Sequence, residues 1–216
     1  MARLLNVGGG PVQVPPEYRG WEVTTLDIDE TVNPDICLDA RELAALEPGQ
    51  YDVVYASHVL EHFSECDVAR VLWGFYHVLA PDGYAHIKVP DALSVCLTVA
   101  QNRMELDDVL YTAPVGPIRV CDVLWGWQAQ ITRSGQPFYS HRYGFSRNTL
   151  GRALKAAHFE YVEIGRGRYE LRAFAYKRRP DGQEGREGGG EKAGGIAGRD
   201  PRADLQGDLP LPPAGG

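Results

Sequence analysis

The sequence predicts an α/β protein, in which a mostly parallel seven-stranded sheet is covered by helices and ends in a C-terminal antiparallel hairpin. Three observations predict this class. Short apolar runs of strand length alternate with segments whose apolar residues recur at helical spacing. A glycine cluster, Gly8-Gly9-Gly10, follows the first apolar run directly. Two late apolar runs are joined by Gly165-Arg166-Gly167, which is typical of a hairpin connection.

Seven runs are expected to form the strands. They are Arg3–Val7, Trp21–Ile28, Asp35–Leu38, Tyr51–Ala56, Tyr84–Val89, Phe159–Ile164 and Tyr169–Tyr176. The first five alternate with helical or turn segments. This alternation favours parallel pairing, because a helix supplies the long crossover that parallel strands need. Only the last two runs are close enough in sequence to pair through a short turn.

Three segments are predicted to be helical. Ala40–Leu46 is a short one, and Cys66–Leu79 carries six apolar residues at helical spacing before the turn residues Pro81-Asp82-Gly83. A third helix begins after Ser146, whose hydroxyl can cap it, and runs to about Ala157. No full helix fits between Gly10 and Trp21, because three of the ten intervening residues are prolines.

Composition divides the chain into a folded part, residues 1–177, and a tail, residues 178–216. The tail has 11 glycines and 5 prolines in 39 positions and no aromatic residue. Such a segment cannot bury enough apolar surface to offset its loss of conformational entropy, so we expect it to be disordered. Within the folded part, residues 102–136 fit neither period and hold Trp125 and Trp127. We expect them to form an inserted lid or cap, with an interface as the alternative.

Charge and composition exclude several classes of protein. The chain has 29 acidic and 22 basic residues, a net charge of −7, which argues against a general nucleic-acid binder. No apolar run approaches the roughly 18–20 residues of a membrane span, and the N-terminus lacks the pattern of a signal peptide. The four cysteines stand far apart without a CxxC pair. We therefore expect a cytoplasmic protein with reduced thiols and no membrane partner.

Five signals carry the chemistry. The glycines after the first strand let the backbone approach a ligand closely. Asp27, at the end of the second strand, can accept hydrogen bonds from both hydroxyls of a ribose. Asp39-Ala40 follows the third strand and offers a carboxylate and an amide to an adenine edge. The remaining two are residues 51–62, YDVVYASHVLEH, and residues 78–84, VLAPDGY.

In this order the five signals resemble class I S-adenosylmethionine-dependent methyltransferases, above all the small, single-domain, type-11-like members. The resemblance covers Met1–Val89 well and Phe145–Lys177 more loosely. It implies a Rossmann-like, three-layer αβα fold for residues 1–177 and S-adenosylmethionine as the cofactor. It also implies methyl transfer to an oxygen or nitrogen of a small molecule, for which we consider a sugar or another secondary or cell-surface metabolite.

The resemblance also assigns cofactor-binding residues. They are Gly8 and Gly10 beside the methionine part, Asn6 and Gly9 in the same turn, Asp27 at the ribose, Ile28, Asp39 and Ala40 at the adenine, and Ser57 and His58 near the sulfonium. Two features depart from the family pattern. Asn6 stands where the family usually has an acid, and the third glycine of the usual turn is missing together with a full first helix.

Catalytic candidates lie just after the fourth and fifth strands. His62 could take a proton from a substrate hydroxyl, and Asp91 could orient it, with His58 as a further candidate. The alternatives are that His62 packs on its helix and that Asp91 is an N-cap. His58-Val59-Leu60-Glu61-His62 also matches the HxxEH motif of zinc peptidases. That motif needs a surrounding helix and a third ligand, neither of which the sequence supplies, so we expect no metal.

Two other functions stay open at this point. A degenerate methyltransferase fold could serve as a scaffold or interaction protein, and the same fold could catalyse a reaction other than methylation. A dehydrogenase is disfavoured, because Gly8-Gly9-Gly10-Pro11-Val12 does not supply GxGxxG followed by a helix. The expected partner is a small-molecule methyl acceptor, and a homodimer stays open as well.

Overall fold

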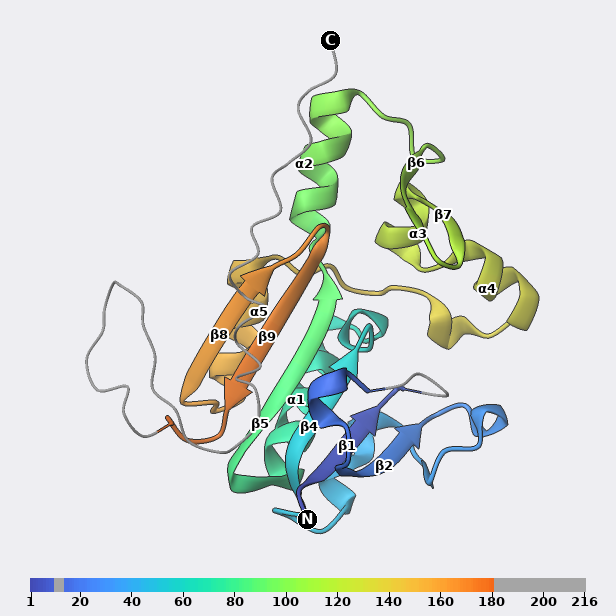
Figure 1. Ribbon diagram of the computed structural model, residues 1–216. Helices are drawn as coiled ribbons and strands as arrows, with labels where there is room; N and C mark the ends of the chain where they lie inside the picture. Colours follow the sequence, from blue (N-terminus) through green and yellow to red (C-terminus); the bar gives the residue numbers. More distant parts are fainter. Residues whose placement is uncertain (10–13, 181–216) are drawn as a thin grey trace.

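The computed structural model describes residues 1–9 and 14–180. Seven strands form one sheet in the order β3-β2-β1-β4-β5-β9-β8 (Figure 1). They are β1 (Arg3–Val7), β2 (Glu22–Asp27), β3 (Ile36–Cys37), β4 (Tyr51–Ser57), β5 (Leu79–Pro90), β8 (Tyr161–Arg166) and β9 (Glu170–Tyr176). Pairing is parallel from β3 to β5, and β9 runs antiparallel to both of its neighbours. The predicted fold class is confirmed.

The α-helices of the described residues are α1 (Glu65–Val78), α2 (Ala92–Asn102), α3 (Val120–Trp125), α4 (Gln128–Ser134) and α5 (Arg147–Ala156). Two of these, α1 and α5, follow the predicted positions closely, whereas α2, α3 and α4 lie outside the three segments predicted to be helical. Ser146 caps α5 as predicted, in a reciprocal capping box with Thr149. The predicted helix after β3 is a 3-10 helix, η3 (Ala40–Ala45). β5 begins at Leu79, and a register shift against β4 leaves residues 80–83, which include the predicted turn residues Pro81-Asp82-Gly83, out of the pairing.

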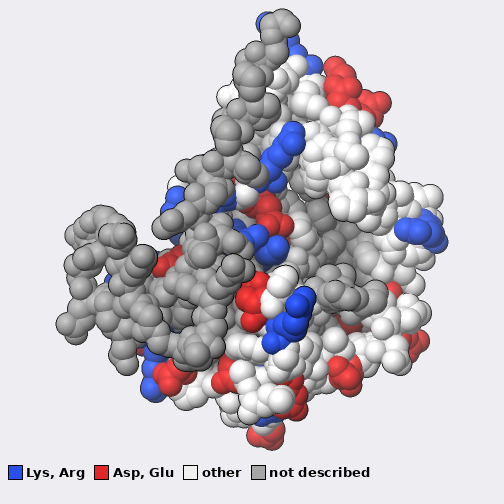
Figure 2. Space-filling model, in the orientation of Figure 1, with Lys and Arg blue, Asp and Glu red and all other residues white. Residues whose placement is uncertain are grey.

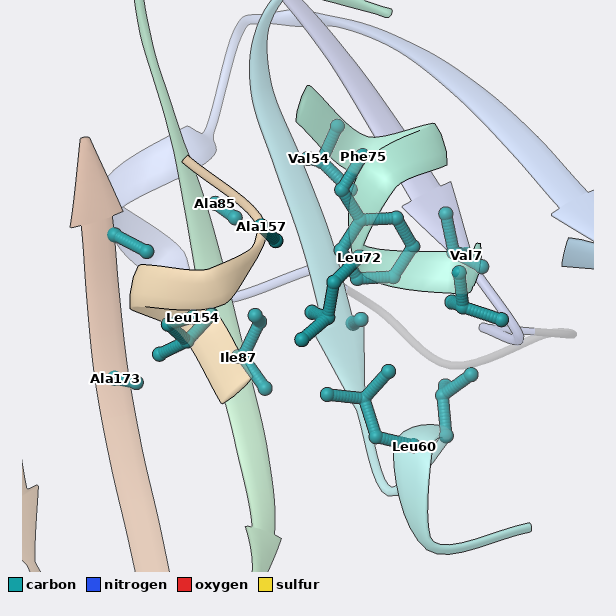
Figure 3. Close-up of a cluster of buried hydrophobic side chains, with 14 of the residues drawn as sticks. Val7, Val54, Leu60, Leu72, Phe75, Ala85, Ile87, Leu154, Ala157 and Ala173 are labelled. Atoms are coloured by element: carbon teal, nitrogen blue, oxygen red, sulfur yellow. The ribbon is translucent and has the colours of Figure 1, made fainter. Parts of the chain in front are cut away.

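One face of the sheet carries α1, α5 and η3 and holds the main core. Phe75 and Leu72 of α1 lie over β4, whereas Leu154 of α5 lies over β5 and β9 (Figure 3). These side chains are fully buried. Burying each one contributes about 1.5–3 kcal/mol, so this layer sets the position of the strand ends above it.

The opposite face of the sheet is covered by an aromatic layer. Tyr18, from η1 (Pro16–Tyr18), packs here with Leu4, Val53 and Tyr55. Its hydroxyl lies 2.8 Å from Nδ1 of His86, whose burial lowers its pKa to about 3. Between β1 and β2, η1 is the only helical element in the part of the chain that the structure describes. The layer is thin because the proline-rich connection leaves no length for a full helix.

A cap stands above the carboxyl ends of the parallel strands (Figure 1). We use this name for residues 103–139, which include β6 (Val109–Ala113), β7 (Gly116–Arg119), α3, α4 and η5 (Pro137–Tyr139). The cap has its own small core, in which Leu110, Val120 and Val123 pack with Val95 of α2. The segment predicted as an insertion is therefore folded, and its function as a lid stays a prediction.

Three further expectations concern the chain as a whole. The four cysteines are free, as predicted. Over the described residues, none of the helices combines the length and apolar character that crossing a bilayer requires. The predicted disorder of residues 178–216 falls, from residue 181 onward, outside the described residues.

Candidate functional site

A pocket of about 350 Å³ lies at the carboxyl ends of β1, β2 and β4. This is where open α/β sheets bind ligands, and the volume falls in the range of small-molecule sites. Three groups of residues line it. They are Val7, Gly8, Gly9, Leu26, Asp27, Ile28, Asp29 and Val32 from the first half of the sheet; Leu38, Asp39, Ala40 and Arg41 around η3; and His58, Val59, His62, Phe63, Phe138, Tyr139 and Arg142.

The glycine turn after β1 is built for close approach of the backbone. Gly8 has a φ of +65° and donates its N–H to the carbonyl of Leu26 at 2.7 Å. A Cβ at Gly8 would lie 2.6 Å from Cγ2 of Val59. A Cβ at Gly9 would overlap the side chain of Asn6, which is buried directly beside it. Both glycines are therefore required by space, and Gly8 by conformation as well; Gly10 lies outside the described residues.

The end of β2 contributes two carboxylates to the pocket. Asp27 accepts a hydrogen bond from the N–H of Asp29 at 3.0 Å, which fixes the turn after the strand. Asp29 caps η2 (Glu30–Val32) and accepts a hydrogen bond from the hydroxyl of Tyr139 at 3.2 Å. Its bonds to Thr31 lower its pKa. The predicted acid thus has a second acid beside it, and this second acid reaches the cap.

The predicted adenine contacts after β3 line the pocket together. Asp39 caps η3 through the N–H of Arg41 and also binds the Arg41 guanidinium, with a shortest distance of 2.6 Å. This bond lowers the pKa of the Asp39 carboxyl. Ile28 is 46% exposed, and its apolar surface faces the pocket. An apolar side chain next to a charged edge suits a planar heterocycle.

His58 is held between two carboxylates. Nδ1 lies 3.2 Å from Glu61, and Nε2 lies 3.2 Å from Glu170 of β9. These bonds outweigh desolvation and raise the pKa of His58 to about 10. His58 is therefore an imidazolium at neutral pH and donates both of its N–H groups. With both ring nitrogens donating, His58 has no lone pair with which to accept a proton, and its part in catalysis stays a prediction.

His62 lies at the cap side of the pocket, at the end of η4 (Leu60–His62). Its Nδ1 donates to the carbonyl of Ser140 at 3.2 Å, so the neutral ring presents Nε2 as an acceptor. The ring of His141 packs edge-on against it, with 4.9 Å between centroids. Burial raises the pKa of Glu61, but the histidines around it lower that pKa by more, so the net shift is downward.

Two predicted site residues are placed elsewhere. Asp91 caps α2 through the N–H of Ser94 and pairs with Nε of Arg166 at 3.1 Å. Asp91 is not among the described residues that line the pocket. Its partners are Ser94 and Arg166, so the predicted pairing with His62 is wrong. The alternative interpretation of Asp91 as an N-cap is confirmed. Ser57 ends β4 and likewise does not line the pocket.

Three further lining residues lie at the far end of the cap and just after it. Phe138, Tyr139 and Arg142 reach the pocket from a segment about 80 residues beyond β4. The N–H groups of Arg142 and Tyr143 both donate to the carbonyl of Glu61, at 2.7 and 3.1 Å, and hold this segment in place. Nothing local in the sequence marks such a long-range contact. From the sequence, the polar stretch of Tyr139, His141, Arg142 and Tyr143 is expected either to face a substrate or to form a structural cluster, whereas nothing in the sequence singles out Phe138.

Charges of both signs surround the site. On the described surface of the face shown in Figure 2, basic and acidic side chains are interspersed over the sheet and the cap. A groove for a nucleic-acid backbone would instead need a continuous basic stripe. The pocket is thus suited to a compact ligand with apolar and polar parts.

Comparisons with known proteins agree with this geometry. A family model described as a methyltransferase domain matches residues 2–164. A search of curated protein sequences found no significant match.

Several solved structures share the fold. A SAM-dependent methyltransferase from Archaeoglobus fulgidus has a TM-score of 0.53 and 16% identity, covering 82% of this chain and 86% of that one. A possible histamine N-methyltransferase from Thermotoga maritima has a TM-score of 0.52 and 14% identity, covering 82% and 83%. A SAM-dependent methyltransferase from Methanosarcina mazei has a TM-score of 0.50 and 13% identity, covering 81% and 90%. At these identities the likeness is one of fold.

Proposed function

The chain belongs to a methyltransferase-domain family of class I, and from this premise we propose that it is an enzyme that binds S-adenosylmethionine in the pocket. It transfers the methyl group to an oxygen or nitrogen of a small molecule. The observation that carries the proposal is the pairing of the Gly8 turn with Asp27 across one pocket at the switch point of the sheet.

The residues present fit this cofactor. A Cβ at Gly8 or Gly9 would collide with Val59 or Asn6, so the chain keeps this turn bare where the methionine part would lie. Asp27 would hold the ribose hydroxyls, and Ile28 would pack on the adenine. Asp39 and Ala40 stand at its polar edge. The buried side chain of Asn6 lies against Gly9 and supports the glycine turn.

The bound cofactor would supply an electrophilic methyl group on a sulfonium. The protein's own part is then to hold the acceptor in line with that group and to exclude water, and such positioning can contribute several kcal/mol. His62 is the residue best placed to accept a proton from a hydroxyl acceptor, because Ser140 holds its Nδ1–H and leaves Nε2 as the acceptor. The imidazolium of His58 contributes charge and structure instead.

A small-molecule acceptor is supported by the side chains on the cap side of the pocket. Phe138 and Tyr139 offer aromatic surface, and Arg142 offers hydrogen-bond donors. This combination suits a hydroxylated ring, such as a sugar or a phenol, better than a polymer. The mixed charges of the surrounding surface support the same choice (Figure 2).

Calorimetric titration with S-adenosylmethionine and S-adenosylhomocysteine tests the proposal. We expect binding of both, and a loss of at least about tenfold in affinity in Asp27→Ala, equivalent to about 1.4 kcal/mol. Glu22→Ala is the matched control, because Glu22 is exposed at the opposite end of the same strand. Absence of binding to the folded wild-type chain would overturn the proposal and favour a scaffold function.

A further inference from the structure

Three side chains meet beside the pocket, and of these only His62 lines it. Glu61, His62 and His141 each place one ligand atom within 4.8 Å of the other two. Glu61 is 1% exposed, and the side chain of His141 is 12% exposed. Two imidazoles and a carboxylate that converge in a buried position form the donor set of many divalent transition-metal sites.

The fold brings these residues together through the backbone. Glu61 and His62 lie on η4, directly after β4, whereas His141 follows the cap. The N–H groups of Arg142 and Tyr143 donate to the carbonyl of Glu61, and the N–H of His141 donates to the carbonyl of Trp125 at 3.2 Å. His141 is thus fixed from both sides. It supplies a ligand from outside the HxxEH segment, in which His58 is no ligand because both of its nitrogens bind carboxylates.

Hydrogen bonds also orient the two rings as ligands. Nδ1 of His141 donates to the carbonyl of Val123 at 2.9 Å, and Nδ1 of His62 donates to the carbonyl of Ser140 at 3.2 Å. Each neutral ring therefore keeps its lone pair on Nε2. In metal sites a carbonyl that accepts the other ring N–H commonly fixes the tautomer and the ring orientation of a ligating histidine.

The carboxylate of Glu61 has one oxygen available. Oε1 binds His58, at 3.2 Å, and lies 4.0 Å from Nε2 of His141. Oε2 is buried and makes no hydrogen bond within the part of the chain that the structure describes. A buried carboxylate oxygen without a hydrogen-bond donor is unusual, because burial of a charged group normally demands a partner. A bound cation would supply that partner.

We propose that Glu61, His62 and His141 form a binding site for a divalent transition-metal ion, with Zn²⁺ as the reference ion. Imidazole nitrogens and one carboxylate favour Zn²⁺ or Fe²⁺ over Mg²⁺, which prefers oxygen ligands. Around an ion bound at about 2.0–2.2 Å the donor atoms lie closer together than they do in this structure. Binding therefore draws the His141 segment toward η4 and leaves coordination positions open for water or a ligand.

The site would join the segment that directly follows the cap to the residues after β4 by a link other than the backbone. It does not depend on the proposed methyl transfer, because the ion binds whether or not a cofactor is present. It does change the part played by His62. A metal ion on Nε2 occupies the lone pair that a general base needs, so His62 can accept a proton only in the metal-free form.

Metal titration of the full-length chain, free of affinity tags and stripped with a chelator, tests the proposal. We expect one Zn²⁺ per chain at micromolar affinity or tighter, and no measurable binding of Mg²⁺ under the same conditions. Glu61→Gln keeps the shape of the side chain, and His141→Asn removes one ligand. Each is expected to weaken Zn²⁺ binding by about 10–100-fold or more, the range found when a supporting group of a metal site is lost.

The control is His158→Asn, which removes an exposed histidine at the far end of α5 and is expected to leave Zn²⁺ binding unchanged. A second readout needs no variant: Co²⁺ in place of Zn²⁺ should give visible absorption bands of a nitrogen- and oxygen-ligated ion. Zn²⁺ binding equal in wild type and Glu61→Gln, or no stoichiometric binding to the folded wild type, would overturn the site. Neither result bears on cofactor binding, which is measured separately.

Discussion

At the scale of single residues, neighbours decide what a side chain can do. His58 and His62 stand four positions apart, yet carboxylates hold one as an imidazolium while a carbonyl leaves the other with a lone pair. Gly8 matters for what it lacks, because Val59 fills the space that a Cβ would need. Gly8 and His58 each yield a prediction.

Replacing Gly8 by alanine is expected to damage both the turn and the pocket. A side chain at a φ of +65° is strained by about 1–2 kcal/mol, and the new Cβ would lie 2.6 Å from Val59. We expect a loss of that order in the free energy of unfolding, measured in urea, together with a loss of S-adenosylhomocysteine affinity of at least about tenfold.

Gly49→Ala is the matched control for the backbone term alone. Gly49 has a φ of +69°, but a Cβ there would meet open space, with no atom from elsewhere in the fold within 4 Å, and Gly49 does not line the pocket. It should lose stability and keep its cofactor affinity. Equal affinities in both variants would show that the Gly8 turn does not contact the cofactor.

His58 predicts a pH dependence of stability. Its pKa is about 10 in the folded chain and about 6.5 when unfolded, so the folded state binds its proton more tightly. The stabilisation is complete below about pH 6.5 and is lost as the pH rises toward 10. Urea unfolding should show wild type losing more stability than His58→Gln over this window. His158→Asn should follow wild type, and parallel curves for wild type and His58→Gln would contradict the ion pairs.

At the scale of elements, the cap is fixed by one buried carboxylate. Asp122 of α3 accepts hydrogen bonds from the N–H of Arg119 and of Gln128, both at 3.0 Å, and pairs with the guanidinium of Arg119. It thereby joins the start of α3 to the start of α4. Its bonds to Arg119 outweigh the effect of burial and lower its pKa.

Asp122→Asn is expected to loosen the cap. The asparagine amide has one oxygen that accepts hydrogen bonds, whereas the two carboxylate oxygens of Asp122 accept from different N–H groups. A buried polar group left without its partner costs about 1–3 kcal/mol. Hydrogen exchange should become faster in β6, β7, α3 and α4 while the sheet keeps its protection. Asp107→Asn, at an exposed cap position, is the control. Faster exchange throughout the sheet as well would mean that the cap does not open on its own.

The sequence predicts elements well where one local rule governs them. Apolar spacing places α1, Ser146 places the start of α5, and the prolines exclude a first helix, because each signal acts within a few residues. The site follows only in part. Gly8, Asp27 and His58 stand directly at strand ends, so topology brings them to one pocket.

The remainder of the site depends on contacts between distant segments. Glu170 binds His58 across 112 positions, and Tyr139 binds Asp29 across 110. No periodicity or motif encodes such a pairing, because it results from how the cap and the hairpin dock on the sheet. The protonation of His58 is therefore beyond sequence reasoning, although its position is not.

At the scale of the whole molecule, the pocket lies between two bodies of packing. The sheet and its helices form the main core, and the cap has a separate one. The hydrogen bond from Tyr139 to Asp29 and the bonds from residues 142 and 143 to Glu61 connect them at the pocket. A ligand that contacts both sides should therefore stabilise the cap against local opening as well as the whole fold.

This coupling gives the last prediction. S-adenosylhomocysteine at about 100 times its dissociation constant should raise the free energy of unfolding by about 2.7 kcal/mol, if it binds only the folded chain. It should also slow hydrogen exchange in α3 and α4, which do not line the pocket. In Tyr139→Phe, which loses the bond to Asp29, the ligand should still raise overall stability but protect the cap less. If exchange in the cap does not respond to the ligand in wild type, the cap is not coupled to the cofactor site, and its function as a lid is excluded.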